Sequence, residues 1–168
     1  MSALLTSPLG LSRPVMVAID VVAWAAIHTS TGYLVHRLPA RTLNTDRWLW
    51  RQRAIERDGR IYTGVFRIKR WKRWLPEAGD IFSGGFNKAS LHRLDTAYLG
   101  LYVRETRRAE LGHWLAVALS PLFFVWNPPV VAAFMVLVYA PLTNGWCILS
   151  QRYNRIRLAR VLSRRSAA

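Results

Sequence analysis

Apolar residues are concentrated in two regions of the chain, near residues 15–35 and 111–150, and a long polar block separates them. The first region contains the run PVMVAIDVVAWAAIHTSTGYLV at residues 14–35. At about 1.5 Å per residue, a helix of this length crosses a hydrocarbon core of about 30 Å, so the run predicts a first membrane span. A cleaved signal peptide is the alternative, although the run is longer than a signal h-region and no A-x-A site follows it.

The second apolar region is divided by the sequence WNPP at residues 126–129. An asparagine and two prolines cannot continue a helix, whereas Pro129 is well placed to begin the next one. We therefore expect a short second span at 111–126, lengthened by the end of a helix that Asp95 caps, and a third span at 130–150.

The third predicted span contains Pro141 and Asn144, which predict a kink whose freed backbone groups need a polar neighbour. The second and third spans then form an antiparallel hairpin. The pattern as a whole predicts an all-α membrane protein with about three transmembrane helices, folded as a single membrane domain over residues 1–168.

The polar block at residues 36–110 contains two further predicted elements. A short helix is expected between the possible cap Asn44 and Gly59, where a helix would stop. Residues 61–76 place apolar side chains at steps of three and four with basic residues between them, which predicts an amphipathic helix lying in the membrane interface. A strand is the alternative for this segment, because aromatic and aliphatic residues also alternate in it.

Charge is distributed as unevenly as hydropathy. The chain has 24 Lys and Arg against nine acids, and the block at 36–110 holds 17 of these basic residues and eight of the acids. A surplus of this size implies a polyanionic partner, either nucleic acid or anionic lipid, and the apolar spans favour lipid. We expect no nucleic-acid partner.

The basic residues also predict the orientation of the spans. The tail at residues 151–168 carries six arginines and no acid, so it is expected on the same side as the basic block. A chain that crosses the membrane three times places the basic block and the tail on the same side. The positive-inside rule then places both segments in the cytoplasm and the N-terminus outside.

A first candidate for catalysis is the sequence RETRRAELGHW. On a helix, Glu110 and His113 are neighbours, and His113 falls angularly between Glu105 and Glu110. A carboxylate beside an imidazole orients the ring and raises its basicity, which general-base activation of an alcohol requires. The alternative is a set of helix-end salt bridges with the nearby arginines.

A second candidate is the sequence QRYNR after the third span. Arg152 and Arg155 are neighbours on a helix and could hold a phosphate or carboxylate, with Tyr153 and Asn154 beside them. A simple topology anchor is the alternative. Further basic residues that could help to hold an anionic ligand lie in the interfacial segment: Lys69, Arg70 and Arg73.

Ionisable residues inside a span need a partner or a purpose, and the first span contains Asp20 and His28. They are predicted either to handle protons or contact a substrate, or each to bond a polar group of a neighbouring helix.

Several reaction types have no support in the sequence. The single cysteine leaves no disulfide or cysteine zinc site, and Glu-x-x-His occurs once where a metal reading needs a second set, so no metal is expected. The G-x-S-x-G, H-x-x-x-x-D and Walker patterns are absent, which favours direct transfer with a base over covalent catalysis.

Four blocks of the chain resemble, in order and spacing, the glycosyl-diaponeurosporenoate acyltransferases, which are small membrane acyltransferases of carotenoid biosynthesis. The resemblance covers about residues 33–160, in blocks that read GRIYTGVFRIKRWKRWLPEAGDIFSGGFNK, YVRETRRAELGHW, PLFFVWNPP and QRYNRIRL. It implies esterification of a sugar hydroxyl of a glycosylated carotenoid acid by a fatty acyl group, at the cytoplasmic membrane of a bacterium. It implies no catalytic residue.

The resulting hypothesis is a membrane acyltransferase that moves a fatty acyl chain from coenzyme A to a hydroxyl of a lipophilic acceptor, with no bound cofactor. His113 is the predicted base, Arg152 and Arg155 the donor site, and Asp20 and His28 the acceptor contacts. The rival hypothesis is a non-catalytic membrane module that binds anionic lipid and a partner enzyme.

Overall fold

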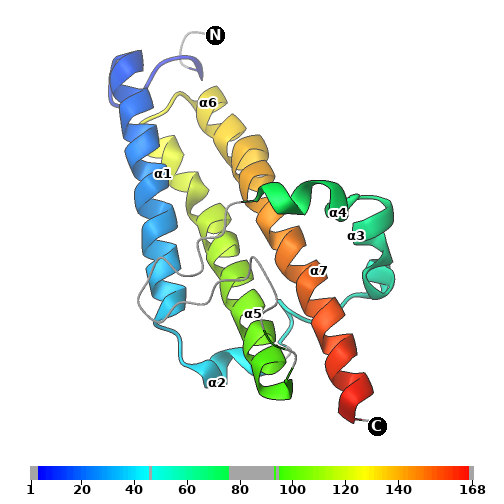
Figure 1. Cartoon of the computed structure of the whole chain (residues 1–168). Helices are drawn as coiled ribbons and strands as arrows, with labels where there is room; N and C mark the ends of the chain where they lie inside the picture. Colours follow the sequence, from blue (N-terminus) through cyan, green and yellow to red (C-terminus); the bar gives the residue numbers. More distant parts are fainter. Residues whose placement is uncertain (1–3, 46, 76–92, 94, 167–168) are drawn as a thin grey trace.

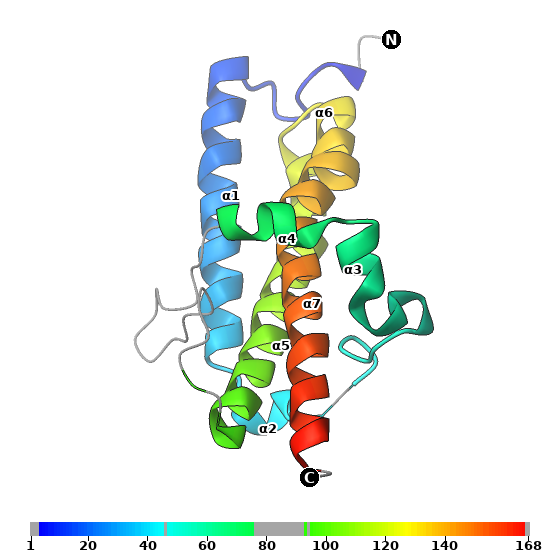
Figure 2. The same ribbon diagram turned by 45° about the vertical axis from the view of Figure 1, so that its right-hand side comes forward.

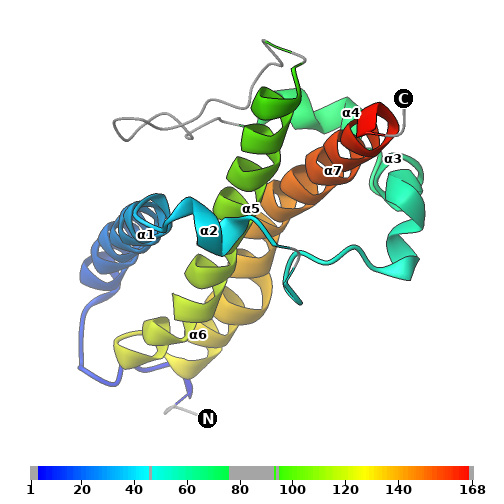
Figure 3. The same cartoon turned by 90° about the horizontal axis from the view of Figure 1, so that it is seen from below.

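The computed structural model describes residues 4–45, 47–75, 93 and 95–166, and within these ranges all regular structure is helical. Three long helical segments lie side by side and alternate in direction (Figure 1). They are α1 (Arg13–His36), α5 (Thr96–Leu119) and a third formed by α6 (Pro129–Phe134), the π-helical η5 (Met135–Tyr139) and α7 (Ala140–Ser166). Viewed along the bundle, α5 lies between α1 and α7 (Figure 3).

The first predicted span is confirmed as a helix, since α1 covers Arg13–His36. Its buried residues recur at steps of three and four, which gives it one face toward the bundle. At its end, the Arg108 guanidinium of α5 donates to three carbonyls, those of Val35, His36 (2.8 Å) and Leu38 (3.1 Å). The last carbonyls of a helix have no partner within it, so this arginine both ends α1 and joins it to α5.

The helix α5 begins at the predicted cap. The Asp95 carboxylate accepts a hydrogen bond of 2.9 Å from the Tyr98 N–H, which satisfies one of the open donors of the first turn. As expected, the helix that Asp95 caps continues into the predicted second span: α5 forms the first part of residues 111–126, and the 3₁₀ segment η4 (Ser120–Val125) forms the rest. A turn through the buried Asn127 then leads into α6.

The irregularity expected near Pro141 takes the form of the π-helical turn η5, directly before it. Proline donates no N–H and its ring displaces the carbonyl four residues earlier, and a wider turn accommodates both effects. The Thr143 hydroxyl donates to the Tyr139 carbonyl at 2.8 Å, the bond that a threonine commonly makes to the preceding turn of its own helix.

Two helical segments of the described chain are long and apolar enough to cross a membrane, Arg13–His36 and Pro129–Arg165. α5 does not meet this criterion, because the charged sequence RETRRAE lies in its middle. The count of three spans therefore stays a prediction. Both qualifying segments expose large apolar side chains away from the bundle, among them Val17, Val21, Val22, Leu34, Leu137 and Leu142.

The connection from α1 to α5 differs from its prediction. The helix expected from Asn44 to Gly59 is wrong, since α2 (Ala40–Leu43) ends at Asn44 and helical structure resumes only at η2 (Ala54–Gly59). Gly59 does end that element, with a left-handed φ of 85° that glycine adopts without strain.

The predicted amphipathic helix at 61–76 is divided into α3 (Arg60–Gly64), α4 (Ile68–Trp71) and η3 (Lys72–Trp74), and Arg67 between them has a left-handed φ of 48°. The strand alternative is not adopted over residues 60–75. We call residues 60–75 the arm. It lies along α7, with α4 across that helix (Figure 2), and the rest of the predicted segment falls outside the described residues.

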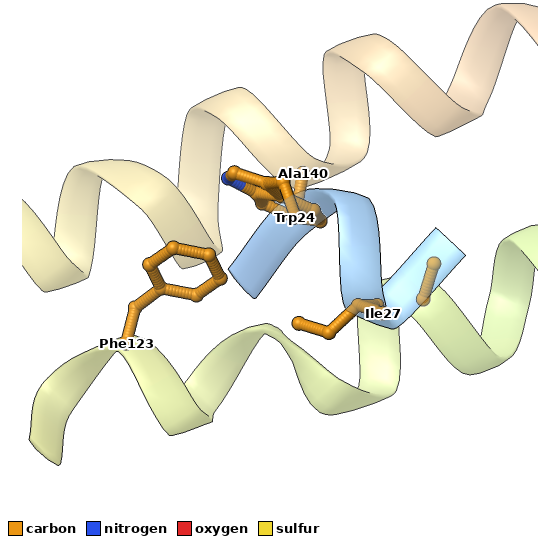
Figure 4. Close-up of a cluster of buried hydrophobic side chains, with 5 residues drawn as sticks. Trp24, Ile27, Phe123 and Ala140 are labelled. Carbon is orange, nitrogen blue, oxygen red and sulfur yellow. The ribbon is translucent and has the colours of Figure 1, made fainter. Parts of the chain in front are cut away.

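Two apolar clusters hold these parts together. The first joins α1, α5, η4 and α7 through Trp24, Ile27, Ala116, Phe123 and Ala140 (Figure 4). The second attaches the arm to α7 through Tyr62, Ile68, Tyr153 and Ile156, and Trp71 packs edge-on against Trp146 of α7 at 4.8 Å between ring centroids. The second cluster thus lies in the half of the bundle that carries the charged residues of α5 and α7, here called the charged half. The first cluster lies in the other, uncharged half.

Candidate functional site

A buried ion cluster joins α5 to α7 in the charged half of the bundle. Glu110 of α5 is fully buried, and its two carboxylate oxygens lie 2.8 Å from Arg152 Nη1 and 2.6 Å from Arg155 Nη1. Arg152 Nε in turn lies 2.9 Å from Glu56 Oε1 of η2. Two carboxylates thus face two guanidinium groups, and buried charges are stable only when paired in this way.

The same arginines fasten the segment that precedes η2. Arg152 donates to the carbonyls of Leu49 at 2.9 Å and Arg51 at 3.1 Å, and Arg155 donates to that of Trp50 at 3.3 Å. The ion cluster therefore holds an irregular segment with few backbone partners of its own against the helices.

This arrangement changes the roles expected for two predicted ligand groups. Arg152 and Arg155 were expected to face a free anion of a donor molecule, but the structure gives both guanidinium groups the carboxylate of Glu110. Glu110 lies 42 residues before Arg152 and 45 residues before Arg155, so helical spacing could not reveal this pairing. Because their charge is already balanced, they make a poor site for a further phosphate.

The two glutamates proposed to orient His113 are engaged elsewhere. Glu110 serves the arginines and also accepts from Trp114 Nε1 at 3.3 Å. Glu105 pairs with Arg108 at 3.0 Å, the helix-end salt bridge that the sequence left open as an alternative. Glu110 thus joins α5 to α7, whereas Glu105 pairs within α5, with the arginine that binds the end of α1.

Glu56 lies at the edge of the ion cluster, and its neighbours shift the pKa of its carboxyl group. Burial raises the pKa of its carboxyl, but hydrogen bonds from Arg152, Tyr62 and the Arg53 N–H outweigh this effect and leave the pKa below its ordinary value. The Tyr62 hydroxyl donates to Glu56 Oε1 at 2.5 Å, and burial together with the carboxylate raises the pKa of that phenol. Both groups therefore keep their ordinary charge states at neutral pH.

Replacing Glu56 with glutamine is expected to flatten the dependence of stability on acid. The folded-state pKa of Glu56 lies below its ordinary value of 4.5, so its stabilisation is complete above that pH and is lost as pH falls through the lower, folded-state pKa. Thermal unfolding of the protein in detergent between about pH 3 and pH 7 measures this. Tyr62→Phe, which removes one of the bonds, should give an intermediate curve, and a gap between wild type and Glu56→Gln that is constant with pH would contradict the assignment.

A second polar group lies where the three long helices meet. His113 Nδ1 of α5 lies 2.9 Å from Asn144 Oδ1 of α7, and the Asn144 side chain is fully buried. The amide nitrogen of Asn144 donates to the Ala140 carbonyl at 3.0 Å, which directs its oxygen to the imidazole. With that oxygen as acceptor, Nδ1 carries the proton and the lone pair of the neutral ring is on Nε2.

His28 of α1 completes what we call the histidine site, formed by His28, His113 and Asn144. Its ring centroid lies 6.3 Å from that of His113 in an edge-on geometry and 5.6 Å from the indole of Trp24, on which it stacks. Each long helical segment therefore contributes one polar side chain.

Asp20, which was expected to act with His28, is placed differently. Its carboxylate accepts hydrogen bonds of 2.7 Å from both Trp126 Nε1 and Asn127 Nδ2. It therefore attaches α1 to the turn before α6, as the alternative of a bond to a neighbouring element described.

The remaining predicted ligands belong to the arm or contact it. Tyr153 is buried in the second apolar cluster, and Lys72 donates to Asn154 Oδ1 at 2.5 Å. In contrast, the three basic side chains of the arm that were predicted as ligands are exposed, namely Lys69, Arg70 and Arg73. Only these three of the predicted basic ligands keep an outward position.

The sequence interpretation missed Asn144 and Glu56 as site residues. The sequence signal for Asn144 was the free-energy cost of a polar side chain inside an apolar span. The sequence interpretation had connected this residue only with the kink. Among the described residues, no group of three or more His, Cys, Asp or Glu side chains is placed to hold a metal ion.

A family model described as glycosyl-4,4'-diaponeurosporenoate acyltransferase matches residues 46–164. A protein of that name from Staphylococcus haemolyticus strain JCSC1435 is 30% identical over 135 residues, covering 80% of this chain and 78% of the relative. One from Staphylococcus aureus strain USA300 is 25% identical over 139 residues, covering 83% of each chain. No solved structure matches.

The matched range contains the whole ion cluster together with His113 and Asn144, whereas α1 with His28 precedes it. The relatives are named as enzymes, so the rival hypothesis of a non-catalytic membrane module is not favoured. Because the family match spans most of its length, the chain belongs to the glycosyl-4,4'-diaponeurosporenoate acyltransferase family and is an acyltransferase.

Proposed function

We propose that the chain is a membrane-embedded enzyme that esterifies a hydroxyl of a lipophilic acceptor, with His113 as the general base. The observation that supports this most directly is the hydrogen bond from His113 to Asn144, which leaves the basic lone pair on Nε2. The names of the relatives suggest the acceptor, a glycosylated 4,4'-diaponeurosporenoate, whose sugar supplies the hydroxyl.

The reaction is a direct acyl transfer. His113 Nε2 takes the proton of the acceptor hydroxyl while its oxygen attacks the carbonyl carbon of a thioester. The carbon–sulfur bond breaks, the imidazolium returns the proton to the departing thiolate, and the products are an ester and a thiol. Asn144 keeps Nδ1 protonated throughout, which suits the ring to exchange a proton at Nε2 alone.

The setting of the histidine site supports an acceptor that resides in the bilayer. Exposed apolar side chains of α1 and α7 border it, and the charged ends of α5 and α7 lie on one side of it. A lipophilic molecule could enter from the apolar side, with His28 beside its polar head. In this arrangement the protein is a multi-pass protein of a bacterial cell membrane, with its arm and C-terminal end in the cytoplasm.

The donor in this proposal is an acyl-coenzyme A, which approaches from the charged side. The exposed cations of the arm, Lys69, Arg70 and Arg73, attract its phosphates and the anionic headgroups of the membrane alike. Incubating the purified protein in lipid nanodiscs with a fatty acyl-coenzyme A and the glycosylated carotenoid acid tests the proposal. Mass spectrometry should detect the ester, and its absence from both this acceptor and other glycolipids would refute the function.

Replacing Asn144 with alanine is expected to lower kcat by roughly tenfold to a hundredfold with little change in KM, because the ring loses the group that orients it. Ser163→Ala is the matched control, since Ser163 is a polar residue of the same helix whose hydroxyl bonds the Arg160 carbonyl of that helix, away from the histidine site. Steady-state kinetics in nanodiscs make the comparison. Equal kcat values for the two variants would contradict a role for Asn144.

A further inference from the structure

A second concave surface lies apart from the histidine site, on the segment that precedes η2. It is an open depression of about 400 Å³ lined by Trp48, Arg51, Gln52, Arg53 and Ala54. The Trp48 side chain is 76% exposed, and the Arg53 guanidinium lies 4.9 Å from the centroid of its ring. An exposed indole beside two guanidinium groups offers a stacking face next to donors for an anion.

The backbone under this depression is held in place. The ion cluster binds the carbonyls of residues 49–51 from the inside, as described above. From the outside, Arg53 Nη2 donates to the Trp48 carbonyl at 2.9 Å and the Arg53 N–H donates to Glu56. A surface ordered in advance binds a ligand with a smaller loss of entropy.

The lining residues match one class of ligand. An exposed indole face stacks with a planar base, and guanidinium groups bind phosphates through paired hydrogen bonds. We propose that the depression binds the nucleotide end of a coenzyme A thioester, with the base on Trp48 and the phosphates on Arg51 and Arg53. This inference rests on the proposed function, in which the donor is an acyl-coenzyme A.

The alternative occupant is the membrane surface, and the structure separates the two. Exposed apolar residues suited to a bilayer interface occur on the arm at Val65 and Trp74, which do not line the depression. Beside Trp48 the lining is cationic and polar, and Gln52 is held by a hydrogen bond of 3.0 Å to Asp58. The long pantetheine chain of coenzyme A lets its nucleotide bind at the surface while the thioester enters the bundle.

Coenzyme A binding to the full chain tests the site. In nanodiscs of zwitterionic lipid, Trp48→Ala is expected to weaken the Kd for coenzyme A by about tenfold, the loss typical of one stacked base. Trp48→Phe, which retains an aromatic face, should bind nearly as well as wild type, and Arg51→Gln should weaken binding. Trp74→Ala is the matched control, because this equally exposed tryptophan lies outside the depression.

Kinetics distinguish this site from the proposed function. Trp48→Ala should raise KM for acyl-coenzyme A about tenfold, while kcat and the turnover of an S-acyl pantetheine without a nucleotide stay as in wild type. Unchanged coenzyme A binding by Trp48→Ala overturns the proposal, as does an equal loss of coenzyme A binding in Trp48→Ala and Trp74→Ala. Failure of acyl transfer with both donors would instead refute the proposed function.

Discussion

Replacing His113 with alanine should lower the rate of ester formation by about 10²–10⁴-fold, the usual contribution of a general base. The variant retains the acceptor and donor surfaces, so the loss should fall on kcat. His113→Gln should lose as much, because the glutamine amide can donate a hydrogen bond to Asn144 but cannot take up the proton of the acceptor hydroxyl. Turnover in nanodiscs, followed by mass spectrometry of the ester, measures both variants.

A histidine outside the site serves as the control for this prediction. His36 lies at the end of α1, two helical turns beyond His28. His36→Ala is expected to remain within about twofold of wild type, since surface changes away from a site are usually small. If His113→Ala turned over at a comparable rate, His113 would not be the base.

Replacing Glu110 with alanine is expected to lower the free energy of unfolding by about 3–5 kcal/mol. Glu110 is fully buried, and its removal leaves Arg152 and Arg155 facing each other inside the protein without their shared carboxylate. Chemical denaturation of the protein in detergent gives this difference. The exposed ion pair between Arg93 and Asp95 offers the contrast, since Arg93→Ala should have almost no effect.

A second substitution separates the loss of an ion pair from a loss of packing. If unpaired charge is the cause, Glu110→Leu combined with Arg155→Leu should recover part of the stability that Glu110→Leu loses alone. Additive losses in the double variant would instead indicate that the side chains contribute through their volume. The result also bears on the depression at Trp48, because the same cluster holds its backbone.

Much of the bundle could be predicted from local sequence. The first helix was expected at 14–35 and occupies Arg13–His36, and Asp95 and the WNPP turn act where they were placed. These features depend on steric and hydrogen-bonding preferences of a few adjacent residues, which are present in the sequence itself. The arm was harder to predict, since a left-handed arginine at position 67 depends on contacts between Ile68 and α7 that lie outside its own segment.

The sequence by itself thus determined the long helices and the segregation of charge, and it led to His113 as the candidate base. Only the tertiary structure decided which groups these residues meet: Glu110 with two arginines, and His113 with Asn144 rather than a glutamate. The reason is physical, because periodicity states which side of a helix a residue occupies, whereas the partner of a buried charge is set by the register in which separate helices pack. That register brings residues 31 to 96 positions apart within hydrogen-bonding distance.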